Sequence, residues 1–167
     1  KLAAAQNNAT ALCNLGFMAQ EGRGMPQNFP NPQMAAECYK KAALLNDTIG
    51  MYNYAVILQN GIGVEKNIIE AAKFYKIAAD KGSSDAQSNY ALLLSAPQGS
   101  NGLKKDLDTA KRYAKMAADQ GNPTGLCIYA QLLLIVDKNK AEAIKYFKLS
   151  AEKGNARAQK KLKELLN

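Results

Sequence analysis

Histidine and tryptophan are absent from this chain of 167 residues, and cysteine occurs only three times. Without histidine the chain lacks the commonest general base, the usual metal ligand and the base that activates a serine or cysteine nucleophile. Cys13, Cys38 and Cys127 lie far apart, and an odd number without Cys-x-x-Cys spacing argues against a disulfide framework. We therefore expect buried free thiols in a reducing compartment, taken to be the cytoplasm, and no metal or cofactor.

Motifs that bind phosphate or cross membranes are also missing. No Gly-x-x-x-x-Gly-Lys-Ser/Thr loop is present, and Gly22-Arg-Gly24 and Gly61-Ile-Gly63 lack a third glycine and a preceding strand. Asp106 and Asp108 stand near an expected helix start, where carboxylates cap backbone N–H groups. The longest aliphatic run, 132–136, is too short for a bilayer. These features predict a protein that is not an enzyme and that has no membrane span in this segment.

Arginine is scarce, although the chain is basic. Lys and Arg number 22 against 14 Asp and Glu, which gives a net charge of +8, but only Arg23, Arg112 and Arg157 are arginine. Lysine is a strongly hydrated point charge, whereas arginine recognises carboxylates, phosphates and base edges with a fixed geometry. The lysines are thus either a solvated surface or a long-range attraction for an acidic partner such as an acidic protein tail, a nucleic acid or an anionic membrane.

Two sequence patterns alternate four times along the chain. The first pattern occupies residues 8–25, 47–64, 83–94 and 122–133. The second occupies residues 34–43, 70–79, 109–118 and 142–151, and its closing alanines (Ala43, Ala79, Ala118, Ala151) are 36, 39 and 33 residues apart. Small or apolar residues recur in both patterns every three or four positions, which predicts two helices per repeat. Glycines follow many of these segments and predict the helix ends.

These repeats predict one solenoid domain over residues 1–167. It consists of the end of a preceding repeat (1–7), four repeats (8–46, 47–82, 83–121 and 122–154) and a C-terminal capping helix (155–167). Because 1–8 align with the close of a second helix, we expect further repeats before Lys1. The lysines of 156–166 give the last helix a polar outer face, which is how a solenoid caps its hydrophobic surface.

The repeated pattern resembles the Sel-one-like repeat (SLR) family. Its signature, A-x-x-x-L-G-x-x-Y-x-x-G-x-G-V followed by K-A-x-x-W-Y-x-K-A-A-x-x-G, is matched nearly position for position by residues 52–82. The third repeat carries an insertion around 97–101, and the fourth lacks the Gly-x-Gly-Val loop. The resemblance implies an all-α, right-handed α-solenoid of TPR-like helix–turn–helix repeats. It also implies first helices on a concave face and second helices on a convex face.

The first helices carry few charges and predict a neutral concave groove. Helical spacing places on one face the residues Asn14, Phe17, Asn53, Val56, Asn89, Leu92 and, with Ile128, Gln131. An asparagine amide both donates and accepts hydrogen bonds, so Asn14, Asn53 and Asn89 suit the backbone of an extended peptide. The alternative is that these asparagines belong to the repeat consensus and bond the neighbouring repeat.

The second helices carry most of the lysines and predict a basic convex face. Its residues are Lys40, Lys73, Lys76, Lys111, Arg112, Lys115, Lys145 and Lys148. The leading hypothesis for the function is an adaptor or scaffold that presents the groove to a segment of another protein. The alternative is a structural component of a large assembly, for example a cytoskeletal one, held through the lysines. Nucleic-acid binding is the weakest alternative, because arginines are few and no aromatic stripe alternates with the basic residues.

Overall fold

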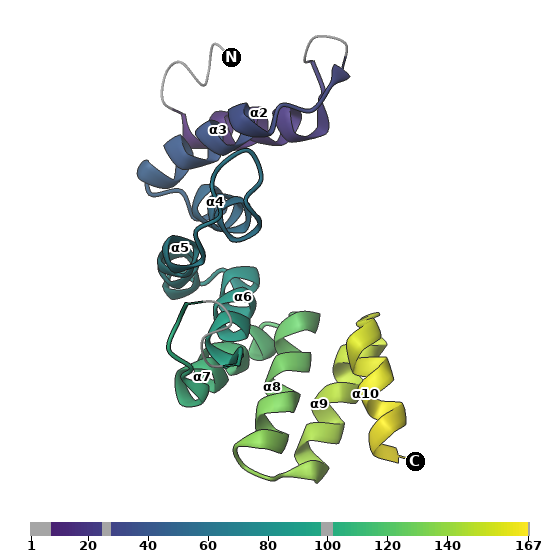
Figure 1. The fold of residues 1–167 in the computed structure, drawn as a ribbon. Coiled ribbons are helices and arrows are strands. Elements are labelled where there is room, and N and C mark those ends of the chain that lie inside the picture. The colour runs from purple at the N-terminus through teal and green to yellow at the C-terminus, as the bar shows by residue number, and fades with distance from the viewer. Residues whose placement is uncertain (1–7, 25–27, 98–101, 167) are drawn as a thin grey trace. The chain divides into compact units, whose positions relative to one another are not determined.

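The computed structural model describes residues 8–24, 28–97 and 102–166 (Figure 1). Over these ranges the chain forms nine α-helices and no strand, so the predicted all-α architecture of helix–turn–helix repeats is confirmed. None of these nine helices is long and apolar enough to cross a membrane. Residues 1–7, which we assigned to a preceding repeat, lie outside the described residues.

The chain divides into two compact units, with the boundary between Lys81 and Gly82. Unit 1 contains α2 (Ala9–Glu21), α3 (Pro32–Leu44), α4 (Thr48–Asn60) and α5 (Ile68–Asp80). Unit 2 contains α6 (Ser84–Ser95), α7 (Leu107–Asp119), α8 (Pro123–Ile135), α9 (Lys140–Glu152) and α10 (Ala156–Leu166). Within each unit every helix packs against the next one along the chain.

Each described helix begins with a polar side chain that accepts a hydrogen bond from a backbone N–H of the first turn. These residues are Asn8, Asn31, Asp47, Asn67, Ser83, Asp106, Asn122, Asn139 and Asn155. The cap predicted at Asp106 is confirmed, since its carboxylate accepts from the Thr109 N–H at 3.0 Å. This bond lowers the pKa of Asp106. The caps satisfy N–H groups that have no partner within the helix.

The predicted glycine helix ends are confirmed as well. Gly22 and Gly61 follow α2 and α4 with φ of 75° and 72°, in the left-handed region that glycine tolerates. Gly82, Gly121 and Gly154 take φ of 98°, 74° and 84° after the second helices. The Gly-x-Gly motifs are therefore helix-ending turns.

The core of each repeat contains one large aromatic side chain from the second helix. Tyr39, Tyr75, Tyr113 and Phe147 are all fully buried. Small residues let neighbouring helices approach closely around them: a Cβ at Gly50 would lie 2.5 Å from the Cβ of Ala42, so α4 touches α3 almost backbone to backbone. Because the interior has no spare room there, the position of α4 against α3 is fixed.

Candidate functional site

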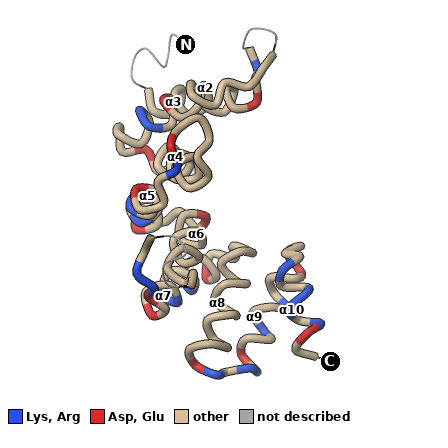
Figure 2. Tube along the Cα trace, in the orientation of Figure 1, with Lys and Arg blue, Asp and Glu red and all other residues tan. Residues whose placement is uncertain are grey.

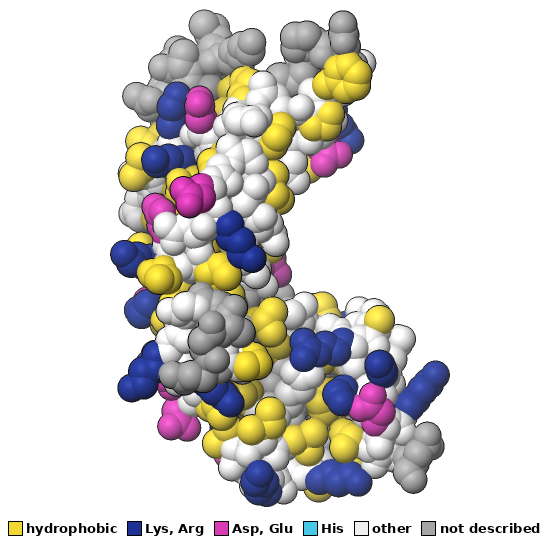
Figure 3. Space-filling model, in the orientation of Figure 1, with side chains coloured by type: hydrophobic (Ala, Val, Ile, Leu, Met, Phe, Trp, Pro, Cys, Tyr) yellow, Lys and Arg dark blue, Asp and Glu magenta, His cyan; other side chains and the backbone are white. Residues whose placement is uncertain are grey.

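A hollow of about 400 Å³ lies in unit 1 between α2 and α4, with α3 behind it. Its lining residues are Thr10, Cys13, Asn14, Phe17, Gln20, Tyr39, Asp47, Ile49 and Asn53. Three of them, Asn14, Phe17 and Asn53, belong to the predicted groove. In the space-filling view, hydrophobic side chains lie among uncharged surface over this part of unit 1 (Figure 3).

Helical spacing positions the open sides of this hollow. Asn14, Phe17 and Gln20 follow one another at intervals of three on α2, and Ile49 and Asn53 are four apart on α4, so each set shares one face. The side chain of Phe17 is 48% exposed and that of Ile49 is 63% exposed, which leaves two large apolar groups open to a ligand. The Arg23 guanidinium carbon lies 5.7 Å from the centre of the Phe17 ring.

The amides of Asn14 and Asn53 make no hydrogen bond through their side chains to any described residue. Neither therefore bonds the neighbouring repeat in the described part of the chain, as the alternative interpretation required. Asn14 is exposed and Asn53 is half-buried. Both amides are available to a ligand as a donor and an acceptor. Val56, the other predicted residue of α4, is half-buried and does not line the hollow.

The floor of the hollow is formed by Asp47 and Cys13. The Asp47 carboxylate accepts from the Gly50 N–H at 2.7 Å and from the Cys13 Sγ at 3.3 Å. Burial, and after it the hydrogen bond to Asp47, raises the pKa of the Cys13 thiol to about 12. The thiol is thus protonated at neutral pH and is not a nucleophile. Burial of all three cysteines is confirmed, and it raises the pKa of Cys38 and Cys127 too.

The back wall is the ring of Tyr39, which burial keeps neutral by raising its pKa to about 12. The ring packs over Gly16, where a Cβ would lie 2.9 Å from the Tyr39 Cε1 atom. The sequence pattern had not singled out Tyr39, Asp47 or Gln20 for the groove. Only Gln20 carried a usable signal, because it lies three residues after Phe17 on the same helical face.

In unit 2 the predicted groove residues lie on α6 and α8. Asn89, Leu92 and Gln131 are all half-buried. The expectation that Ile128 would lie open beside Gln131 was wrong, because Ile128 is only 3% exposed. The reason is that α8 packs against α6, α7 and α9 and so has a much narrower open face than a helix with fewer neighbours.

A polar network joins the two first helices of unit 2. The Asn122 side chain donates to the Asp85 carboxylate at 2.7 Å and accepts from the Ser88 hydroxyl at 3.0 Å, while also capping α8. Gln120 donates to Gln87 at 2.8 Å. The cap residue Asn122 thus connects two successive repeats, because it bonds α6 from the start of α8.

Seven of the eight predicted basic residues are exposed, namely Lys40, Lys73, Lys76, Arg112, Lys115, Lys145 and Lys148. Lys111 is half-buried and donates to Asp137 at 2.5 Å, which raises the Lys111 pKa. Ion pairs also join Lys76 to Asp80 at 2.7 Å and Lys115 to Asp119 at 2.8 Å. The charges are shown along the chain in Figure 2. A partner that binds Lys76, Lys111 or Lys115 therefore has to displace the carboxylate that already pairs with that lysine.

The described part of the chain contains no group of three or more acidic or cysteine side chains that could hold a metal ion. The polar groups that line the hollow are amides, one hydroxyl, one phenol, one thiol and one carboxylate that already has partners. This set of groups suits hydrogen bonding to a ligand more than proton transfer.

The family model for the Sel1 repeat matches residues 9–47, 48–83, 84–122 and 125–155. A crystal structure of a protective antigen from uropathogenic Escherichia coli, described as displaying an SLR fold, is 30% identical with a TM-score of 0.87. A Sel1 repeat protein from Oxalobacter formigenes is 31% identical with a TM-score of 0.81. An immunity protein from Pseudomonas aeruginosa, at 22% identity and a TM-score of 0.61, shares the fold. Among curated proteins, none matches this chain.

These alignments cover 96%, 95% and 90% of this chain. The chain in turn spans 34% of the Escherichia coli antigen, 64% of the Oxalobacter formigenes protein and 55% of the immunity protein. The similarity therefore covers nearly all of this chain but only the matching repeats of the longer proteins.

Proposed function

Because the chain belongs to the Sel1 repeat family, whose members are typically protein-interaction modules and generally non-catalytic, we propose that its hollow between α2 and α4 binds an extended segment of another protein. In this proposal the chain is a non-catalytic adaptor or scaffold in the cytoplasm. The hollow holds the segment, and α3 supports it by packing against both α2 and α4.

The observation that carries the proposal is the pairing of two unbonded amides with two exposed apolar side chains. Asn14 and Asn53 offer donors and acceptors that match the N–H and C=O groups of a peptide backbone. Phe17 and Ile49 offer the contact area, and full burial of one such side chain contributes about 1.5–3 kcal/mol. Backbone bonds give affinity and apolar contacts give selectivity in this kind of recognition.

The residues that line the hollow also limit which kind of protein segment can bind there. Asp47 is the acidic residue in the hollow, and its carboxylate already accepts two hydrogen bonds, so the site offers little to a charged ligand. A volume of about 400 Å³ is at the small end of the range for binding pockets. The segment is thus uncharged where it enters the hollow and inserts an apolar side chain.

A structural role in a large assembly, such as a cytoskeletal one, is the second candidate function. The exposure of Lys40, Lys73 and Arg112 supports it, since these side chains have no carboxylate partner among the described residues. The three ion pairs of Lys76, Lys111 and Lys115 weaken it. The scarcity of arginine leaves nucleic-acid binding as the weaker alternative.

The test starts from peptides selected from a random displayed library on the whole chain, with affinities then measured by fluorescence anisotropy. We expect Asn14→Ala/Asn53→Ala to weaken binding by about tenfold or more, as the loss of buried hydrogen bonds to the peptide implies. The matched control is Gln33→Ala/Asn60→Ala, which removes two exposed amides that lie outside the hollow. Equal losses in the two variants, or no loss in either, would rule out the hollow as the docking site.

A further inference from the structure

The net positive charge of the chain is concentrated in its last helical hairpin. Residues 138–167 hold nine basic residues against Glu142, Glu152 and Glu164, a net charge of +6 out of +8. The nine are Lys138, Lys140, Lys145, Lys148, Lys153, Arg157, Lys160, Lys161 and Lys163. The rest of unit 2, residues 82–137, carries five basic and five acidic residues and is neutral. Blue positions outnumber red ones along α9 and α10 in Figure 2.

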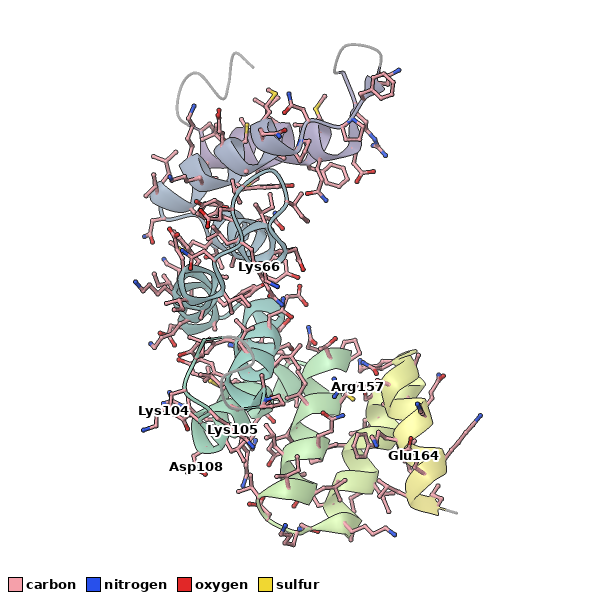
Figure 4. The ribbon with its side chains drawn as sticks, viewed as in Figure 1. Lys66, Lys104, Lys105, Asp108, Arg157 and Glu164 are labelled. Atoms are coloured by element: carbon pink, nitrogen blue, oxygen red, sulfur yellow. The ribbon has the colours of Figure 1, made fainter. Side chains whose placement is uncertain are left out.

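These charges are exposed and mostly unpaired. Among the described residues, the hairpin has one ion pair, between Lys161 and Glu164. Lys145, Lys148, Lys160 and Lys163 are exposed, and none has a carboxylate within ion-pair distance in the described chain. Arg157 and Glu164 lie on α10 (Figure 4).

The outer side of α9 also carries a hollow with an apolar component. It measures about 510 Å³ and is lined by Asn139, Ala141, Glu142, Lys145, Tyr146 and Leu149. Leu149 is 46% exposed and follows Lys145 by four residues, so an apolar and a cationic side chain lie next to each other on one face of α9. The Glu142 carboxylate in this hollow accepts from the Asn139 amide at 3.0 Å.

A hollow at the equivalent repeat position of α5 shows what distinguishes α9. That hollow, of about 360 Å³, is lined by Asn67, Ile69, Glu70, Lys73, Phe74 and Ile77, each 72 positions before its counterpart on α9. Its electrostatic setting differs, however. Lys76 is held by Asp80, and residues 8–81 carry seven basic and six acidic residues. Equivalent repeat positions line both hollows, but the sequence around α9 carries a much larger net positive charge than the sequence around α5.

We propose that the α9–α10 hairpin is a docking surface for an acidic protein segment that places carboxylates against Lys145 and Lys148 and an apolar side chain against Leu149. This surface is separate from the hollow between α2 and α4 and does not depend on the function proposed there. Charge complementarity is the argument for the occupant, since uncompensated lysines attract and orient an anionic partner before contact.

The chemistry favours an acidic peptide over other polyanions. Eight of the nine cations are lysines, whereas recognition of phosphate with defined geometry favours arginine. Leu149 can form an apolar contact with an aliphatic side chain of a peptide. A nucleic acid has no aliphatic side chain to make this contact.

The experiment measures the binding of a labelled peptide of Asp and Glu with a single central Leu to the whole chain. We expect Lys145→Glu/Lys148→Glu to weaken binding by about tenfold or more at about 50 mM salt, where screening is weak. Lys73→Glu/Lys76→Glu reverses the same two repeat positions on α5 and gives the same change in net charge. We expect that control to retain affinity within about twofold, because residues 8–81 are nearly neutral and Lys76 is already paired with Asp80.

A second pair of variants tests the apolar contact. Leu149→Ala should weaken the binding of the peptide with the central Leu and leave the binding of a peptide with Ser at that position unchanged. Ile77→Ala, the equivalent change on α5, should alter the affinity for neither peptide. Circular dichroism checks that all variants fold. The proposal is overturned if the peptide does not bind, if the α5 and α9 reversals weaken it equally, if Leu149→Ala has no selective effect, or if duplex DNA or vesicles of anionic lipid bind the wild type more tightly than the peptide does.

Discussion

The thiol of Cys13 illustrates at the scale of single residues how a reactive group becomes part of the structure. It is buried beneath the hollow, it donates to Asp47 and its pKa is raised to about 12. This bond links α2 to the start of α4 and so helps to hold together the two helices that border the hollow. Cys13 therefore helps to hold α2 and α4 in place and takes no part in a reaction at the hollow.

The raised pKa predicts slow alkylation of Cys13. Because the pKa lies three units above 9.0, the thiolate fraction at pH 8 is about a thousandfold lower than in an unfolded chain, and the rate should fall accordingly. The rate should also keep rising with pH well past pH 9, whereas that of the unfolded chain levels off. Mass spectrometry of samples quenched over time, with and without denaturant, measures both. Rapid labelling of Cys13 in the folded protein near pH 7 would contradict this account.

Gly50 marks the place where α3 and α4 come closest. A side chain there would overlap Ala42, so Gly50→Ala should lower the free energy of unfolding by about 1–3 kcal/mol despite the better helix propensity of alanine. Gly154→Asn is the contrasting control, since Gly154 has φ of 84° but open space around it, and asparagine tolerates that conformation. Urea denaturation followed by circular dichroism compares the two. A stabilised Gly50→Ala would show that the helices are not in close contact.

At the scale of elements, some helix caps also form hydrogen bonds to a neighbouring repeat, whereas others bond only their own helix. The Asn122 side chain caps α8 and also connects it to α6 through Ser88 and Asp85, whereas the Asn139 side chain caps α9 and, among the described residues, bonds only Glu142. Both asparagines satisfy N–H groups of a first turn, but Asn122 also ties one repeat to the next. Successive repeats in a solenoid stabilise one another through such interfaces.

We therefore expect Asn122→Ala to destabilise the protein by about 1–2 kcal/mol and Asn139→Ala by about 0.5–1 kcal/mol. The larger loss reflects the two bonds from Asn122 to Ser88 and Asp85 that join α8 to α6, although the Ser88 hydroxyl can still donate to the Ser84 carbonyl oxygen. Chemical denaturation of both variants measures the difference. If Asn139→Ala were the more damaging of the two, the link between α6 and α8 would contribute no stability.

The helices and their caps could be predicted from the sequence because they depend on the spacing of residues close together in the chain. The step of three or four residues predicted the helices, and it also placed Asn14 and Phe17 on one face of α2. Ile128 was misplaced because its burial depends on how many neighbours α8 has, which no spacing within α8 records. Tyr39 and Asp47 reach the hollow from other elements, so their contribution depends on packing between helices.

The distribution of charge is the feature that matters at the scale of the whole molecule. The sequence showed a net charge of +8 and predicted a basic convex face on the second helices. The structure shows that Lys76, Lys111 and Lys115 are held by carboxylates, including Asp137, which is 26 residues from Lys111. Unpaired charge accumulates at the α9–α10 hairpin. The pairs of Lys76 and Lys115 follow from a spacing of four residues within one helix, whereas the pair of Lys111 with Asp137 depends on packing between elements and could not be read from composition.

The two proposed surfaces differ in their response to salt. Binding in the hollow between α2 and α4 rests on amides and apolar contacts, and should change by less than about threefold between about 50 and 500 mM salt. Binding of an acidic peptide to α9–α10 should fall by more than about tenfold over the same range. Anisotropy titrations with the two peptides measure both slopes. A steep salt dependence for the peptide selected in the hollow would show that charge, and not the amides, attracts it.

Photocrosslinking tests the central claim, that the hollow of unit 1 receives a protein segment, most directly. A benzophenone amino acid is placed at Phe17, at Ile49 or at Ile69, which is 51% exposed on α5 and lies outside this hollow. Each variant is irradiated with the selected peptide, and the crosslinked products are identified by mass spectrometry. The account predicts strong crosslinks from positions 17 and 49, with little product from position 69. Equal yields at all three positions, or a crosslink from position 69 alone, would contradict it.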